Sequence, residues 1–155
     1  MQFVLVDIAD REKFYPFSLT QSVAQFRMGI YSFQERWEHL LNKETAIYTV
    51  PYLQKLYNNS DFLQNKEAAI FINVTCIPTS DLVDEILNLK FGEKIISKSG
   101  KWIATYTDER SIEKILLANF TPITFEQGAF VQDAMGMLQL HTKFIENDFN
   151  WAKKH

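Results

Sequence analysis

Two cations and a carboxylate follow the first apolar run of the chain within a few positions of one another. Residues 2–8 (QFVLVDI) have the pattern of a buried β-strand with Asp7 near its end, and Arg11 and Lys13 come directly after it. Cations bind phosphate oxygens, and ligands of open α/β sheets bind at the carboxyl ends of strands. We therefore predict that Asp7, Arg11 and Lys13 border a site for an anionic ligand. A solvent-exposed charged loop is the simpler interpretation, and the residues alone leave both open.

Asp7 itself has two interpretations. Its carboxylate can bind a sugar hydroxyl or a metal ion, or it can cap the turn after the strand by accepting a backbone hydrogen bond. A second polar set, Asn73, Thr75 and Cys76, stands at the end of the strand-like run 68–74 (AAIFINV). We expect a ligand-binding crevice between the loop 7–16 and the connection 73–78, and these three residues would border it. Cys76 is the only cysteine, which excludes a disulfide within the chain, and such a cysteine is most often a small buried hydrophobe.

The common phosphate-binding and metal-binding motifs are missing from the sequence. Neither G-x-x-x-x-G-K-[ST] nor G-x-G-x-x-G occurs, so no standard glycine-rich loop cradles a phosphate. The three histidines, His39, His141 and His155, stand in no metal-ligand spacing with one another or with Cys76.

Strand and helix patterns alternate through the first ninety residues. We expect strands at 2–8, 46–50 and 68–74, a hairpin over 94–107 with its turn at Ser99-Gly100, a loop at 58–61, and helices over 22–42 (interrupted at Gly29), 52–57, 81–90 (capped by Ser80), 108–119 (capped by Asp108) and part of 130–151. This pattern predicts an α/β fold, with a Rossmann-like, mostly parallel sheet covered by helices, in which the runs 2–8 and 68–74 are neighbours. Phe33, Trp37 and Leu41 share a helical face, so Trp37 should pack in the core.

Composition excludes several classes of protein. With 155 residues, of which 46% are hydrophobic and 23% charged, the chain matches one soluble globular domain over 1–155. The net charge of −3 argues against nucleic-acid binding, and no apolar run approaches the ~20 residues of a membrane span. We expect a cytoplasmic protein, and the oligomeric state is left open.

Three segments resemble one known family. The run 14–41 (FYPFSLTQSVAQFRMGIYSFQERWEHLL) is similar to the opening of a family of sugar nucleotidyltransferases often called GlmU-like, whose pattern is close to LLPLTFTRPVADLRVGILTIREKWE. The agreeing positions are Pro16, Leu19, Thr20, Val23, Ala24, Arg27, Gly29, Ile30, Glu35 and Trp37. Residues 70–78 (IFINVTCIP) and 137–149 (MLQLHTKFIENDF) are similar to the family's FINASFLP and IFELNGEAIRADF.

The resemblance implies a nucleotidyltransferase-like (glycosyltransferase-A-like) fold, followed in the family by a β-helix of hexapeptide repeats. The implied reaction joins a nucleoside triphosphate and a sugar-1-phosphate into a nucleotide-sugar and releases pyrophosphate, with Mg²⁺ as cofactor. Thr20, Arg27 and Asn73 then join Asp7, Arg11 and Lys13 as candidates for binding the substrate or its phosphates.

The chain departs from the pattern of active members of the family. The segment 9–12 replaces the glycine loop, Lys13 takes the place of the loop's arginine, and Cys76 aligns near the aspartate that holds the metal. Side chains on such a loop hinder close approach of the backbone to phosphates, and Mg²⁺ demands hard oxygen donors. We therefore expect either a sugar nucleotidyltransferase or a non-catalytic ligand-binding or interaction module that descends from one.

Overall fold

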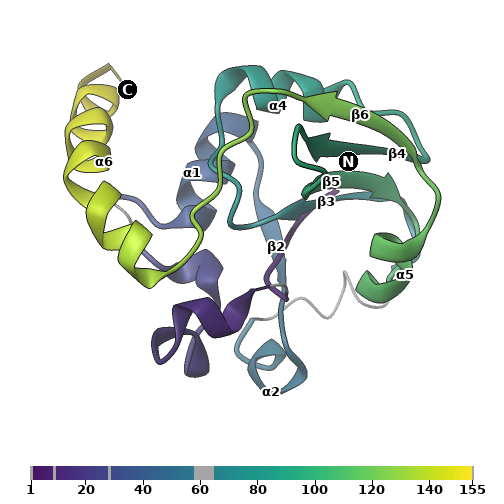
Figure 1. Ribbon diagram of the computed structural model, residues 1–155, viewed down its shortest axis with the longest axis horizontal. Coiled ribbons are helices and arrows are strands. Elements are labelled where there is room, and N and C mark those ends of the chain that lie inside the picture. Colours follow the sequence, from purple (N-terminus) through teal and green to yellow (C-terminus); the bar gives the residue numbers. More distant parts are fainter. Residues whose placement is uncertain (1, 9, 28, 58–64, 155) are drawn as a thin grey trace.

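The computed structural model describes residues 2–8, 10–27, 29–57 and 65–154, and six strands of this part form one sheet (Figure 1). The strands are β1 (Gln2–Val6), β2 (Thr45–Tyr48), β3 (Ala69–Asn73), β4 (Glu93–Ser97), β5 (Trp102–Thr107) and β6 (Thr121–Phe125), in the spatial order β2-β1-β3-β5-β4-β6. The expected loop at 58–61 and Ala9 lie outside the described residues.

Five of these six strands run in the same direction. β1 is parallel to β2 and to β3, and β4 is parallel to β6, whereas β5 is antiparallel to both of its neighbours. This confirms the mostly parallel sheet and the pairing of the first strand with the third. The hairpin over 94–107 is confirmed as well, because Gly100 takes a φ of 88° in the turn between β4 and β5.

Alternate residues of the central strands face two separate apolar layers. Phe3 and Leu5 of β1 belong to the large cluster that contains Trp37, whereas Val4 and Val6 belong to a smaller cluster with Ile115. Burial on both faces explains why β1 and β3 are continuous apolar runs and not alternating ones. Trp37 is fully buried, as predicted.

Helices cover both faces of the sheet. The helices of the described part are α1 (Phe33–Leu41), α2 (Pro51–Gln54), α4 (Ser80–Leu87), α5 (Ile112–Leu117) and α6 (Ala134–Lys154), with short 3-10 turns η1 (Arg11–Phe14), η2 (Phe17–Leu19) and η3 (Val23–Gln25). The larger cluster holds side chains of α1 and α4, and the smaller one those of α5. No helix in the described part of the chain combines the length and the hydropathy that a membrane crossing requires.

Several boundaries differ from the sequence-based expectation. α1 begins only at Phe33, because Ser32 and Glu35 form a reciprocal capping box and Gly29 takes a φ of 85°. Thr79 caps α4 in place of Ser80, and Ser111 caps α5 in place of Asp108; each hydroxyl accepts a backbone N–H three residues ahead.

The strand β6 was not expected from the sequence. It is an edge strand whose side chains are exposed or half-buried, and it contains Pro122, so it lacks the apolar pattern of the inner strands.

The long C-terminal helix α6 stands outside α1, away from the sheet (Figure 1). Arg36 of α1 holds Asp148 of α6 through two hydrogen bonds of 2.6 Å, and Gly29 donates its N–H to His141 Nδ1 at 3.1 Å. A Cβ on Gly29 would come within 2.4 Å of an Asp148 oxygen, so this close approach requires glycine.

Candidate functional site

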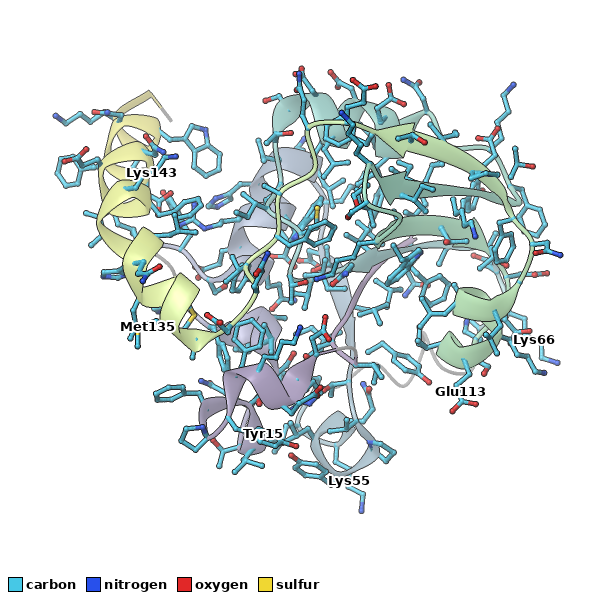
Figure 2. The ribbon with its side chains drawn as sticks, viewed as in Figure 1. Tyr15, Lys55, Lys66, Glu113, Met135 and Lys143 are labelled. Carbon is cyan, nitrogen blue, oxygen red and sulfur yellow. The ribbon has the colours of Figure 1, made fainter. Side chains whose placement is uncertain are left out.

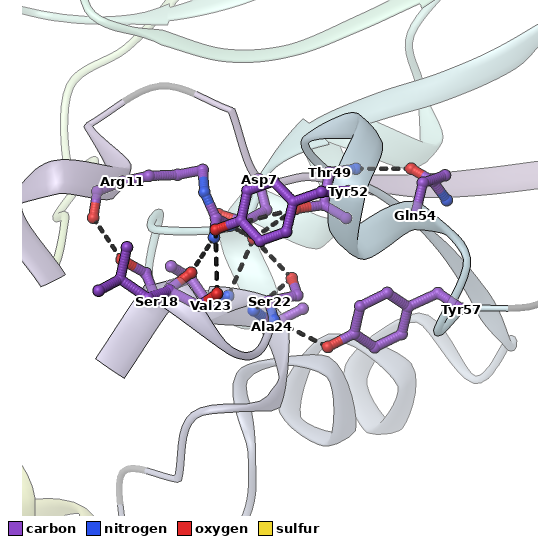
Figure 3. A network of polar contacts seen from close by, with 11 residues as sticks. Asp7, Arg11, Ser18, Ser22, Val23, Ala24, Thr49, Tyr52, Gln54 and Tyr57 are labelled. Carbon is purple, nitrogen blue, oxygen red and sulfur yellow. Dashed lines mark hydrogen bonds and ion pairs between the residues drawn. The ribbon is translucent and has the colours of Figure 1, made fainter. Parts of the chain in front are cut away.

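Asp7 lies just past the carboxyl end of β1 and is buried, with 2% of its surface exposed. Four donors converge on its Oδ2 atom: the Arg11 guanidinium, the Ser22 hydroxyl at 2.7 Å, the Val23 N–H at 3.0 Å and the Thr49 hydroxyl at 3.1 Å (Figure 3). The donors come from three segments, so this carboxylate ties the loop after β1 to residue 49 and to the turn at 22–23. We call Asp7, Arg11, Ser18, Ser22 and Thr49 the Asp7 network.

Arg11 is turned into the protein and not toward solvent. Its guanidinium contacts the Asp7 carboxylate, donates to the Thr49 hydroxyl at 3.1 Å and donates to the Ser18 carbonyl. The Ser18 hydroxyl in turn donates to the Arg11 carbonyl at 2.7 Å. The η1 turn brings the side chain inward because Arg11 and Phe14 share its buried side.

Burial dominates the electrostatics of the network. Loss of water raises the pKa of Asp7 above its ordinary value, and the Ser22 hydroxyl, the Arg11 charge, the Val23 N–H and the Thr49 hydroxyl each pull it back. Asp7 accepts the Val23 N–H and two hydroxyls, and these three donors lie outside the turn that directly follows β1.

The other candidate residues do not converge on Asp7. Lys13 is exposed and pairs with Asp10 at 3.6 Å, and Thr20 is exposed at the end of η2. Arg27 is exposed, donates to the Ile30 carbonyl at 2.6 Å and lies 3.9 Å from Glu35. Asn73 is buried at the end of β3.

Asn73 and Cys76 serve the packing of the same sheet edge. The Asn73 amide donates to the Trp102 carbonyl at 3.1 Å, and its oxygen accepts the Thr75 hydroxyl at 2.9 Å. Cys76 is fully buried and pairs with Phe130 in an isolated antiparallel bridge, so the segment 129–131 lies along the 75–77 connection. Burial raises the pKa of the Cys76 thiol to about 12.

Lys101 is a cation at this edge that the sequence analysis missed. Its ammonium lies 3.5 Å from an Asp10 oxygen and 4.5 Å from the centre of the Phe130 ring. The available signal was the hairpin: a strand antiparallel to its neighbours begins where they end, so residues after the Ser99-Gly100 turn return to the carboxyl ends of β1 and β3. Asp10 therefore forms ion pairs with both Lys13 and Lys101, outside the Asp7 network. Its backbone φ is 61°.

The clearest cavities lie elsewhere in the described protein. One of about 710 Å³ is lined by Tyr31, Glu38, His39, Leu40, Asn42, Ser80, Trp151 and Ala152 of α1, α4 and α6 and the residues next to them. A second, of about 250 Å³, shares Leu40, Ser80 and Trp151 with it, and a third, of about 430 Å³, follows the start of α6. The second cavity contacts Ile77 and Pro78 of the connection 73–78, but none of the three is lined by a residue of the loop 7–16. The crevice expected between that loop and that connection stays a prediction.

The residues at the sheet edge do not fit Mg²⁺. The cation demands several hard oxygen ligands in near-octahedral geometry. The position expected for its aspartate carries the buried Cys76, and Asp7 already accepts four donors on one oxygen. Among the described residues no cluster of three or more His, Cys, Asp or Glu side chains could hold a metal ion.

The mixed sheet, its helices on both faces and the Asp7 network past the carboxyl ends of β1 and β2 define an α/β domain. Open sheets of this class bind ligands at the carboxyl ends of their strands. A family model described as sugar nucleotidyl transferase matches residues 3–155, and the chain belongs to this family.

A solved structure supports the same fold. A Bacillus anthracis protein assigned as a glucose-1-phosphate thymidylyltransferase, crystallised in complex with a sucrose, superposes with a TM-score of 0.56 at 9% sequence identity. The match covers 94% of this chain and 95% of that one. No curated protein matches the chain significantly.

Proposed function

We propose that this chain is a sugar nucleotidyl transferase domain that binds a sugar phosphate or a nucleotide but does not transfer a nucleotidyl group by itself. The observation that carries the proposal is the Asp7 network. The acid and the arginine nearest to the expected phosphate site bind each other and the chain around them.

Nucleotidyl transfer, the reaction of active relatives, places strict demands on the groups around the triphosphate. An oxygen of the sugar-1-phosphate attacks the α-phosphorus of a nucleoside triphosphate, a new P–O bond forms, and the bond to the β-phosphate oxygen breaks to release pyrophosphate. Donors must lie close to the triphosphate to stabilise the developing charge. Here Asp10 and Glu12 stand on the loop and would repel a triphosphate by ~1 kcal/mol each in water.

The loop nevertheless supports descent from a phosphate-binding loop. Asp10 adopts a left-handed backbone conformation, which glycine enters without strain, in the segment where the family has its glycines. Lys13 and Lys101 meet at Asp10 through partly exposed ion pairs of 3.6 and 3.5 Å. Such pairs contribute only about 0–1 kcal/mol, so a phosphate can replace the Asp10 carboxylate as the partner of both lysines.

The test combines ligand binding with turnover. We expect sugar-1-phosphates or nucleoside triphosphates to raise the melting temperature of the protein, with a smaller shift in Lys13→Ala and in Lys101→Ala. Lys114→Ala, on the exposed side of α5, is the matched control and should keep the full shift. We expect no pyrophosphate release from a panel of these substrates with Mg²⁺.

Two outcomes would contradict the proposal. Turnover that is lost in Asp7→Asn, in a variant that retains its circular dichroism spectrum, would make Asp7 a metal ligand and the chain an active enzyme. Absence of any ligand-induced shift in the folded wild-type protein would favour an interaction module in place of a ligand-binding one.

A further inference from the structure

The carboxylate of Asp10 lies between two ammonium groups that come from distant parts of the chain. Lys13 Nζ is 3.6 Å from Asp10 Oδ1, and Lys101 Nζ is 3.5 Å from Asp10 Oδ2. Lys13 belongs to the turn η1, whereas Lys101 directly precedes β5. Two cations therefore meet on the two oxygens of one carboxylate. A phosphate group also carries several oxygens on one atom, so it can take the place of this carboxylate.

Hydrogen bonds of the backbone hold both lysines in place. The Lys13 N–H donates to the Asp10 carbonyl at 3.1 Å, which closes the first turn of η1. The Lys101 N–H donates to the Ser97 hydroxyl at 3.1 Å, and the Ser97 N–H donates to the Lys101 carbonyl at 2.8 Å. The Lys101 ammonium also lies 4.5 Å from the centre of the Phe130 ring. None of these contacts uses the Asp10 side chain, so the two cations stay in place when that side chain turns away.

The Asp10 carboxylate is held loosely and can be reached from solvent. Both of its distances to the ammonium nitrogens exceed the roughly 2.7–3.2 Å of an N–H···O hydrogen bond. The Asp10 side chain is 33% exposed, and that of Lys13 is 52% exposed. The same segment continues to Tyr15, which is 54% exposed and lies on the outside of the molecule (Figure 2). Rotation of one side chain is therefore enough to open the position between the lysines.

The balance of charge selects the ligand of this position. Lys13 and Lys101 supply two positive charges, and a phosphate monoester carries about −1.5 to −2 charges near pH 7. A nucleoside triphosphate carries two further phosphates, which the two ammonium groups leave unpaired. Glu12, which is exposed and directly precedes Lys13, repels these additional charges. A single phosphate monoester therefore matches the site better than a triphosphate.

We propose that Lys13 and Lys101 bind the phosphate group of a sugar phosphate, and that the Asp10 carboxylate occupies their site as a built-in competitor in the ligand-free protein. This inference rests on the proposed function and goes further in two respects: the ligand is a phosphate monoester and not a nucleoside triphosphate, and Asp10 must turn aside before it binds. Asp10 weakens binding because it pairs with both lysines and because its charge stays near the bound phosphate.

Calorimetric titration of the whole chain with inorganic phosphate, glucose 1-phosphate and ATP, without Mg²⁺, tests the proposal. We expect Asp10→Asn and Asp10→Gly to lower the Kd of glucose 1-phosphate by about fivefold or more, because a like charge about 4 Å away is removed. Both replacements tolerate the left-handed backbone at this position, where φ is 61°. Glu12→Gln is the matched control: it removes a charge from the same turn without freeing the lysines, and it should change this Kd by less than about twofold.

The tighter binding of the Asp10 variants must depend on the lysines. Adding Lys101→Ala to Asp10→Asn should abolish it, and a gain that survives this substitution would refute the site. If the wild type binds glucose 1-phosphate and neither Asp10 variant binds it more tightly, Asp10 is no competitor, although the proposed function stands. ATP that binds as tightly as glucose 1-phosphate would refute the preference for a monoester. A lack of binding to all three compounds in the wild type and in both Asp10 variants would overturn the proposed function itself.

Discussion

The buried ion pair between Arg36 and Asp148 allows a direct test of whether α6 is docked on α1. The carboxylate of Asp148 accepts two hydrogen bonds of 2.6 Å from the guanidinium of Arg36 and one of 2.9 Å from the N–H of Ile30. The two charged side chains are only 10% and 3% exposed, and the Phe144 ring lies 4.5 Å from the guanidinium carbon. The substitution Asp148→Ala removes one charge and leaves the other inside the protein.

The expected loss of unfolding free energy is about 3–5 kcal/mol, because breaking a buried pair leaves an uncompensated charge. Total stability of such a domain is on the order of 5–15 kcal/mol, so the variant loses a large share of it. Replacing both partners, as in Arg36→Met with Asp148→Leu, leaves no buried charge and should recover most of the loss. The recovery separates the charge effect from the loss of packing.

Urea denaturation followed by circular dichroism measures these differences, and limited proteolysis reports whether α6 has left the body of the protein. Arg27→Ala is the exposed control: its ion pair with Glu35 spans 3.9 Å at the surface, and its loss should cost about 1 kcal/mol or less. If Asp148→Ala is as stable as this control, α6 is not docked in solution and the reasoning fails. If the double variant is no more stable than the single one, the pair acts through packing alone.

Three further predictions concern the core and the sheet edge. Trp37→Ala should lower the unfolding free energy by about 3–5 kcal/mol in the same denaturation assay, because Trp37 is fully buried; near wild-type stability would place α1 against a partner and not in the core. Cys76 should resist alkylation in the native protein and react only after unfolding, since burial raises the pKa of its thiol to about 12; rapid native labelling would show that the segment 129–131 opens. Burial raises the pKa of Asp7 above its usual 3.8, so the folded state binds this proton more tightly than the unfolded state. The unfolding free energy should therefore contain a contribution that falls as pH rises from 3.8 through the raised pKa, and a wild-type pH profile identical in shape to that of Asp7→Asn would refute it.

Much of the fold could be predicted from local pattern. The apolar runs at 2–8 and 68–74 are typical of strands buried on both faces, and they are neighbours in the sheet. The Ser99-Gly100 pair predicted the hairpin, since Gly100 needs the positive φ of that turn. The similarity of residues 14–41 to the family's opening pattern predicted the family, and the family model that matches residues 3–155 confirms it.

Local pattern was less informative where an element is short or exposed. The side chains of the edge strand β6 are exposed or half-buried. Because they do not have to fill a core, they show no alternating apolar pattern. Thr79 and Ser111, which cap α4 and α5, have neighbours that are equally able to cap a helix. Only the path of the backbone decides which side chain accepts the N–H groups of the first helical turn.

The sequence by itself determined which residue types stand at the ends of β1 and β3: an acid, an arginine, an asparagine and a cysteine that the chain places after apolar runs. Only the tertiary structure decided what they contact. Arg11 turns inward because Ser18 and Thr49, 7 and 38 residues away, supply its acceptors together with Asp7. Arg36 meets Asp148 across 112 residues for the same reason. A buried charge must be paired, and its partner is set by the packing of distant elements, which local sequence does not encode.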